Sequence, residues 1–256
     1  MFINKKMKFP KIVTMYRVKN ESRWIKKSIE SVSKISDEII ILDDGSTDNT
    51  IEICESFNTV IEIHKQKNIP YDETRDKNIL LKKVLKRNPD FILSLDGDEI
   101  LQSNTRDILF EEICVLHPKI NVFEFQALFM WEHPRQYRYD GVYSNTWWKR
   151  LLRMENQPKA LEFKNTQFNN NAHCPAIPPN AIGIEESVRS NCKIFHYGNY
   201  DESLRQHKYQ FYNDIDPYNK IFDGYKHIIS GKSSMSGSNG IRIKTINSEV
   251  DVPIIK

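Results

Sequence analysis

The chain has 256 residues, of which 39% are hydrophobic and 28% charged, with a formal net charge of +3. This length suffices for a sizeable core, and this composition excludes an intrinsically disordered chain. The small net charge gives no reason to expect nucleic acid as a partner. The basic first residues lack the apolar core of a signal peptide, and no apolar run is long enough to span a bilayer. We therefore expect a cytoplasmic protein.

The first hundred residues alternate strand and helix patterns. Apolar and β-branched runs predict four strands, at residues 11–16, 37–42, 60–64 and 91–95. The segments between them carry apolar residues at helical spacing, over residues 20–34, 47–57 and 72–87. This alternating order predicts an α/β fold with a mostly parallel central sheet flanked by helices on both faces.

The pattern changes after residue 101. A helix is expected over residues 105–116, a long strand over 121–131, a short strand from 191 and a helix from 202. Aromatic residues and arginines crowd residues 132–154, where the rings could stack on sugars or fill a core. Arg205 and Lys208 lie one helical turn apart, so they could face a diphosphate or a solvated surface.

Four cysteines are spread along the chain without a CxxC pair, so we expect no disulfide framework. A zinc site is a minor alternative, although the spacing is not that of a structural zinc site. Its ligands would be His173, Cys174, Cys192 and His196.

The sharpest chemical signal is Asp96-Gly97-Asp98, which directly follows the fourth predicted strand. Two carboxylates on either side of a flexible glycine can share one hard cation. Such a cation can hold a diphosphate and neutralise a departing nucleotide. In parallel sheets ligands bind at the carboxyl ends of the strands, which is where this motif falls. The alternative is a solvated acidic turn.

A second acidic pair, Asp43 and Asp44, ends the second predicted strand. At a strand end, a carboxylate can accept hydrogen bonds from a base N–H or a ribose hydroxyl. The alternative is a helix N-cap, a role that suits Ser46 or Asp48.

These motifs together resemble the nucleotide-sugar-binding half of family 2 glycosyltransferases, which have the GT-A fold. The resemblance lies in residues 12–21, 39–50, 73–78 and 93–99, and later segments resemble a bacterial and viral branch of the family. It implies an enzyme, a hexosyltransferase-like glycosyltransferase. We accordingly expect one GT-A domain with a donor half and an acceptor half, followed by a C-terminal tail. The expected bounds are 8–228 for the domain, 8–101 and 102–228 for its halves, and 229–256 for the tail.

The resemblance also implies roles for residues that bind the donor. Thr14 and Tyr16 match positions that hold the nucleotide base, and Asp44 matches the carboxylate that reads the base edge. Arg75 lies where the family places a basic residue near the donor.

The metal site is implied in the same way, with Mn²⁺ or Mg²⁺ as the cofactor. Asp96 would contact the ribose or a metal-bound water, and Asp98 would be the principal metal ligand. His196 matches a late histidine that reaches the same metal, and its alternative is a core histidine.

The catalytic base has no clear match. An inverting transferase needs a carboxylate or an imidazole to take the proton from the acceptor hydroxyl. His173 has a family-like context, Glu185 lies at a suitable distance along the chain, and Glu132 is a third candidate. Asp140 and Glu186 are also available.

The predicted function is transfer of a sugar from a nucleotide-sugar to a hydroxyl acceptor, with a metal ion and with inversion, and UDP is the expected nucleotide. The acceptor would be a glycan, a lipid-linked molecule or a protein, with no nucleic acid as partner. The basic start and the aromatic residues are compatible with peripheral membrane contact.

Three alternatives remain open from the sequence. A haloacid-dehalogenase-type phosphatase also ends a strand in Asp-x-Asp, but usually on the first strand of the chain. A nucleotidyltransferase would need a glycine-rich loop after the first strand. A non-catalytic sugar- or metal-binding module is the third, although Ile100 and Leu101 do not suit a calcium loop.

Overall fold

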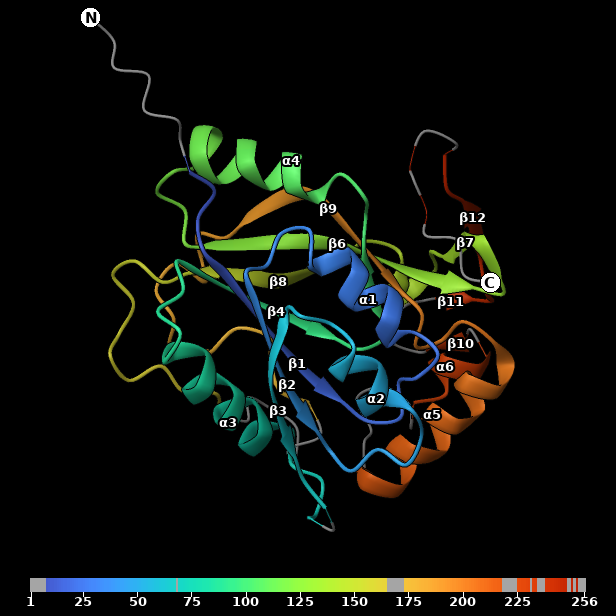
Figure 1. Ribbon diagram of the computed structural model, residues 1–256. Coiled ribbons are helices and arrows are strands. Elements are labelled where there is room, and N and C mark those ends of the chain that lie inside the picture. The colour runs from blue at the N-terminus through green and yellow to red at the C-terminus, as the bar shows by residue number, and fades with distance from the viewer. Residues whose placement is uncertain are drawn as a thin grey trace, which may run out of the picture.

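The computed structural model describes residues 8–67, 69–164, 173–217, 225–230, 232–233, 238–247, 250 and 252. Within these residues the main feature is a 10-stranded sheet, whose path has the strand order β12-β7-β6-β8-β4-β1-β2-β3, with β5 and β9 attached to it (Figure 1).

The first half of the chain alternates strands and helices as predicted. The strands are β1 (Ile12–Val18), β2 (Glu38–Asp43), β3 (Val60–Lys65) and β4 (Phe91–Asp96), and the helices between them are α1 (Ile25–Val32), α2 (Thr50–Glu55) and α3 (Glu73–Leu85). β1 pairs in parallel with β2 and β4, and β2 with β3. The predicted α/β class is therefore confirmed.

The second half extends the same sheet with mixed pairing. Its helical segments are α4 (Thr105–Glu111), a π-helical turn (Glu112–Leu116), a 3₁₀ turn (Gly141–Tyr143), α5 (Glu202–Ile215) and α6 (His227–Ser230). Its strands are β5 (Glu99–Leu101), β6 (Val122–Trp131), β7 (His133–Arg138), β8 (Thr146–Arg153), β9 (Val188–His196), β10 (Lys232–Ser233), β11 (Ser238–Asn239) and β12 (Ile243–Thr245). β8 is antiparallel to β4 and β6, whereas β6 and β9 are parallel. Parallel pairing is thus concentrated in β1–β4.

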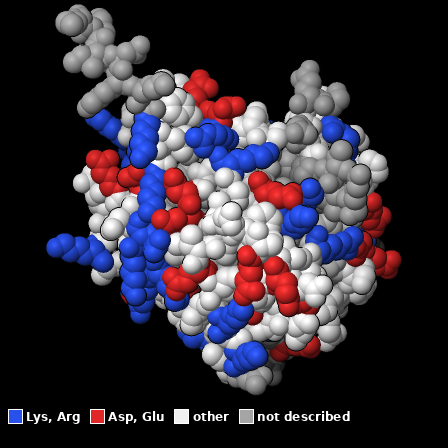
Figure 2. Space-filling model, viewed as in Figure 1, with Lys and Arg blue, Asp and Glu red and all other residues white. Residues whose placement is uncertain are grey.

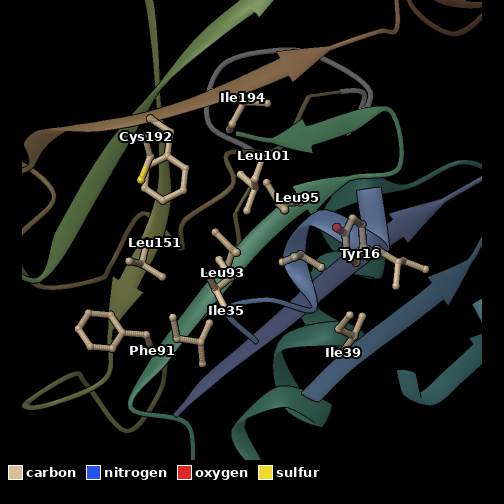
Figure 3. Packing of buried hydrophobic residues seen from close by; sticks show 14 of the residues in the cluster. Tyr16, Ile35, Ile39, Phe91, Leu93, Leu95, Leu101, Leu151, Cys192 and Ile194 are labelled. Carbon is tan, nitrogen blue, oxygen red and sulfur yellow. The ribbon is translucent and has the colours of Figure 1, made fainter. Parts of the chain in front are cut away.

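The larger core cluster lies on the sheet face that α1, α2 and α4 cover. Ile29 of α1, Cys54 of α2 and Leu109 of α4 are fully buried and belong to one cluster with Ile39 and Leu93 of the sheet. Figure 3 shows the sheet side of this cluster. Helical spacing of the apolar residues puts them on one face of each helix, which explains why these segments pack here.

A second cluster lies on the opposite face, under α3. Leu80 and Val84 of this helix pack against Val13, Ile40 and Ile92. Because successive residues of a strand point to opposite faces, strands with cores on both sides are apolar throughout.

The segment predicted as a tail belongs to the fold. β12 pairs antiparallel with β7 at the edge of the main sheet. Ile246 and Val252 are each only 5% exposed and share a cluster with Trp24 and Tyr197. The Ser/Gly-rich stretch from about residue 230 is followed by only weak strand character, so the sequence does not predict which strand β12 pairs with. Residues that pack in the fold therefore lie on both sides of the domain boundary expected at residue 228.

The visible surface carries charges of both signs. In Figure 2 a column of Lys and Arg runs down the left of the face shown, with Asp and Glu beside it and across the rest. None of the helices in the described part of the chain has the length and apolarity needed to cross a membrane.

Candidate active site

The carboxyl ends of β1, β2 and β4 meet at one edge of the sheet. In register, Val18 lies opposite Asp43 of β2, and Arg17 lies opposite Asp96 of β4. The two acidic motifs predicted from sequence are thus brought together on either side of the end of β1. α5 lies at this end of the sheet, at the lower right of Figure 1.

Thr14 and Tyr16 do not lie at this edge, contrary to the expectation from the family resemblance. Both side chains are 0% exposed. The Thr14 hydroxyl contacts that of Ser36, and the Tyr16 hydroxyl lies 2.9 Å from Ser28 Oγ. Figure 3 shows Tyr16 among the buried residues of the larger core cluster. Burial raises the pKa of Tyr16 far above its ordinary value. These hydroxyls pair with polar groups near α1 inside the core.

Arg17, one position further on, points to the other side and links the acidic groups of the edge. Its Nη2 donates to Asp44 at 2.7 Å, and its Nε donates to the fully buried Asp76 at 2.9 Å. The Tyr71 ring lies 4.4 Å from the guanidinium carbon. Asp44, the predicted base-reading carboxylate, is 6% exposed and also lies 3.5 Å from Lys19 Nζ. Asp44 therefore sits in a fixed and positively charged setting.

Arg75 lies beside this group and binds the same buried carboxylate. Its Nη2 donates to Asp76 at 2.6 Å, and Gln66 Nε2 donates to the same Oδ1 at 2.9 Å. Arg75 also bonds the backbone oxygen of Pro70. The structure thus places Arg75 at the start of α3, where it holds the preceding loop in position.

Two loops of the edge are locked together. Asn20 Oδ1 accepts from the Thr47 N–H at 2.7 Å, and Asp48 accepts from the N–H groups of Ser22 and Thr50 at 3.0 Å each. Asp48 therefore links the two loops, although the N-cap residue of α2 is Asn49 and not the expected Ser46 or Asp48.

Asp96 lies next to a buried ion pair. Arg150 contacts the fully buried Glu99 and lies 3.4 Å from Asp96 Oδ2. Burial would raise the pKa of Asp96, but the positive charges around it, with Arg150 the strongest, together outweigh this effect and lower the pKa to about 2. Glu99 also accepts from the backbone N–H of Asp96 at 3.1 Å. Asp96 is therefore ionised at neutral pH and held by both partners.

Asp98 meets two basic side chains around a glycine. Its Oδ2 lies 3.7 Å from His196 Nε2 and 3.9 Å from Lys208 Nζ of α5. A Cβ atom on Gly198 would lie 2.2 Å from this oxygen, 2.6 Å from His196 Cε1 and 2.6 Å from Lys208 Nζ. Only glycine leaves the three groups room to converge.

Sheet pairing brings His196 to this place. β5 pairs with β9 so that Glu99 lies opposite His196, and the Tyr197 N–H donates to the Asp98 carbonyl at 2.9 Å. Burial lowers the pKa of His196 to about 4, against the opposing effect of Asp98. The imidazole is therefore neutral at neutral pH, the form that binds metals.

This donor set fits a hard divalent cation with open positions. Among the described residues, no three His, Cys, Asp or Glu side chains form a ready-made cage. Mg²⁺ usually keeps several waters and binds through one or two carboxylates together with substrate phosphates. Asp98 with a neutral His196 suits such a site, and Asp96 is ionised beside it.

The three base candidates lie in different surroundings. Arg205 Nη2 lies 2.6 Å from Glu132 Oε1, and the backbone N–H of Glu132 donates to the Tyr200 carbonyl. Glu185 is exposed and precedes β9, whose far end carries His196. A strand of this length spans about 26 Å, so Glu185 lies at the opposite edge of the sheet from Asp98. Glu185 was a candidate because of its distance along the chain, but the length of β9 separates it from the site.

His173 lies in a loop that is held against α3. The N–H of Cys174 donates to Glu73 at 3.0 Å, and Lys77 Nζ donates to the Cys174 carbonyl at 2.8 Å. His173 Nε2 lies 3.0 Å from the Tyr225 hydroxyl. Burial lowers the pKa of His173, so its imidazole is neutral at neutral pH.

The alternative zinc set is not assembled. Cys192 is buried in the cluster under α1 and α4, whereas Cys174 packs on the cluster under α3. These clusters lie on opposite faces of the sheet, so the two thiols cannot share a metal ion.

Sequence reasoning missed several groups of this edge. Arg17 follows directly from strand alternation, once Tyr16 is placed in the core. Arg150 lies 54 positions from Asp96, and no local pattern links the two residues. Asp76 resembles an ordinary residue of a helix first turn, although it is fully buried.

A sheet covered by helices on both faces, with acidic motifs at the ends of the two strands that flank β1, is the arrangement expected for a GT-A fold. The chain belongs to glycosyl transferase family 2, whose family model matches residues 16–181, more than half of the chain. This membership sets aside the phosphatase and nucleotidyltransferase alternatives.

Curated relatives match over shorter stretches. An uncharacterised glycosyltransferase of Rickettsia bellii is 34% identical over 103 residues, covering 38% of this chain and 31% of the relative. The cholesterol galactosyltransferase of Borreliella burgdorferi is 28% identical over 96 residues, covering 36% of this chain and 25% of the relative. The chain thus spans about a third of the length of such relatives.

Solved structures are similar at a low level. Staphylococcus aureus TarS, residues 1–349, has a TM-score of 0.43 at 14% identity, covering 86% of this chain and 69% of that one. Glucosyl-3-phosphoglycerate synthase from Mycobacterium tuberculosis, in a complex with Mn²⁺ and UDP, has a TM-score of 0.36 at 18% identity. That match covers 47% of this chain and 44% of the other.

Proposed function

We propose that this glycosyltransferase binds a nucleotide-sugar at the carboxyl edge of β1, β2 and β4 and uses Mn²⁺ or Mg²⁺ held by Asp98. The observation that carries the proposal is the meeting of Asp98 with a neutral His196 around Gly198, next to the ionised Asp96. A bound cation would neutralise the diphosphate as it departs. UDP is the proposed nucleotide and inversion the proposed outcome.

The base of the nucleotide would lie on the other side of the end of β1. Arg17 and Lys19 both contact Oδ2 of Asp44. They fix this carboxylate so that Oδ1 would accept a hydrogen bond from a base N–H. Of the three residues predicted to hold the base, only Asp44 lies at this edge, since Thr14 and Tyr16 lie in the core.

His173 is the proposed base for the acceptor hydroxyl. The Tyr225 hydroxyl donates to Asp216 at 2.8 Å, so it accepts from the Nε2–H of His173, and the basic lone pair is then on Nδ1. In transfer, Nδ1 would take the hydroxyl proton while the acceptor oxygen attacks the anomeric carbon. The bond to the diphosphate oxygen breaks, and its electron pair leaves with the nucleotide. Replacing His173 with Ala should lower kcat by about 10²-fold or more.

The test is release of nucleoside diphosphate from UDP-, GDP- and dTDP-sugars, each with Mn²⁺, Mg²⁺ or EDTA. We expect one donor to be consumed only with a cation, and Asp98→Asn to lose about 10²-fold or more of this activity. Asp107→Asn, at an exposed position of α4, is the matched control and should behave as wild type. Equal turnover in EDTA would contradict the role of the cation.

A further inference from the structure

Lys208 stands next to the oxygen on which the proposed cation site depends. Its Nζ lies 3.9 Å from Asp98 Oδ2, and Gly198 makes room for it there. One ammonium group therefore already supplies positive charge to the place where a divalent cation would bind.

We propose that Lys208 is an internal counter-ion of Asp98, which a divalent cation displaces and which then binds the donor diphosphate. The proposal rests on the donor site proposed above. A cation bound by Asp98 repels the ammonium group, because like charges a few ångströms apart repel strongly at a partly buried site. The diphosphate is the anion that donor binding would add to this site.

The mobility of the Lys208 head group does not require α5 to move. Its side chain is 26% exposed, and its charge is carried on a flexible four-carbon stem. The helix itself is anchored at its first turn by Asp201, which accepts from the Leu204 N–H at 2.9 Å. The head can therefore swing while the backbone stays in place.

Arg205, one helical turn before Lys208, is fixed in place by its contacts. It is 6% exposed, donates to the carbonyls of Asn199 and Tyr200 and to Glu132, and lies over the Trp131 ring at 3.9 Å. Of the two basic residues that the sequence placed one turn apart, only Lys208 is positioned to exchange partners.

The first test is Mn²⁺ binding to the nucleotide-free protein, followed by electron paramagnetic resonance of free Mn²⁺. Lys208→Met should bind Mn²⁺ about tenfold more tightly than wild type, because the competing charge is gone. Lys208→Arg keeps the charge and should stay near wild type. Lys27→Met removes a lysine of α1 whose side chain is 43% exposed, and it is the matched control. Equal Mn²⁺ affinity of Lys208→Met and wild type would overturn the competition.

The second test is UDP binding at saturating Mn²⁺, with thermal unfolding to show that each variant is folded. Lys208→Met should bind UDP about tenfold more weakly than wild type. Unchanged UDP affinity would overturn the diphosphate role. If the wild type bound no nucleoside diphosphate, the proposed donor site would be refuted. The Mn²⁺ affinities of wild type and Lys208→Met would still show whether Lys208 competes with the cation for Asp98.

Discussion

The charged residues at the carboxyl edge of β1, β2 and β4 form pairs of opposite charge, and the surrounding packing fixes each pair. Asp44 is set by Arg17, and Asp96 by Arg150. Both carboxylates were predictable from the sequence, because acidic residues directly after an apolar run are a local pattern. Their pairing with Arg17 and Arg150 was not predicted, because it depends on which strands lie side by side in the sheet.

At the residue scale, Arg150 tests how much the buried ion pair contributes. Replacing Arg150 with Met leaves Glu99 buried without its partner and should lower the free energy of unfolding by about 3 kcal/mol or more. Urea unfolding measures the change. Arg189→Ala, at a side chain that is 61% exposed, should cost less than about 0.5 kcal/mol. Similar losses for both variants would contradict the account.

A substitution at Gly198 tests whether His196 and Lys208 need this glycine to approach Asp98. Gly198→Ala places a methyl group 2.2 Å from Asp98 Oδ2, so the carboxylate, His196 or Lys208 must shift. We expect a folded protein whose Mn²⁺ affinity falls by about tenfold or more. Gly240→Ala is the matched control, since its added Cβ would meet nothing within 4 Å. Calorimetry of both variants decides, and an unaffected Gly198→Ala would refute the geometry.

At the element scale, the strands β1–β4 and the helices between them follow from local patterns. The apolar runs and the helical spacing are sufficient because each element buries its face against its neighbours. The same double burial explains the error at Thr14 and Tyr16. In a strand apolar on both faces, alternation does not show which polar side chain leaves the core.

Asp201, the N-cap of α5, provides a test by pH. Burial raises the pKa of Asp201, but the bonds from the Leu204 N–H and from Arg23 outweigh this effect, so its pKa lies below 3.8. A depressed folded pKa stabilises the protein above the unfolded value, and the contribution is lost as pH falls through the folded pKa. Asp201→Ala should cost about 1 kcal/mol at pH 7.

Asp201→Asn keeps a good capping residue and removes the charge. The stability difference between wild type and Asp201→Asn should be present at pH 7 and disappear on acidification below about pH 4. Urea unfolding at a series of pH values measures it. A difference that grows in acid would have the wrong sign and would argue against this role of Asp201.

At the scale of the whole molecule, the C-terminal residues complete the sheet rather than trail from it. Arg135 bonds the carbonyls of Asn247 and Val250, and Ile246 packs in the same cluster as Trp24 of the first half. The sequence could not predict this, because β12 is three residues long and pairs with a strand about a hundred positions earlier.

A substitution at Ile246 tests how much the packing of the residues after β12 stabilises the protein. Ile246→Ala removes buried methyl groups and should lower the free energy of unfolding by about 2 kcal/mol or more. Ile243, in the adjoining strand, is 36% exposed, so Ile243→Ala should cost clearly less. A single unfolding transition in both variants is expected, since one sheet contains strands from both halves of the described chain. A separate early transition in Ile246→Ala would instead indicate an independent tail.

The central claim is that Asp98 and a divalent cation together create the donor site. Calorimetric titration of UDP, GDP and dTDP, with and without Mn²⁺, on wild type and on Asp98→Ala tests it most directly. We predict that wild type binds one nucleotide tightly only with Mn²⁺, and that Asp98→Ala does not bind it under either condition. Binding that is independent of both Mn²⁺ and Asp98, or no binding by folded wild type, would contradict the claim.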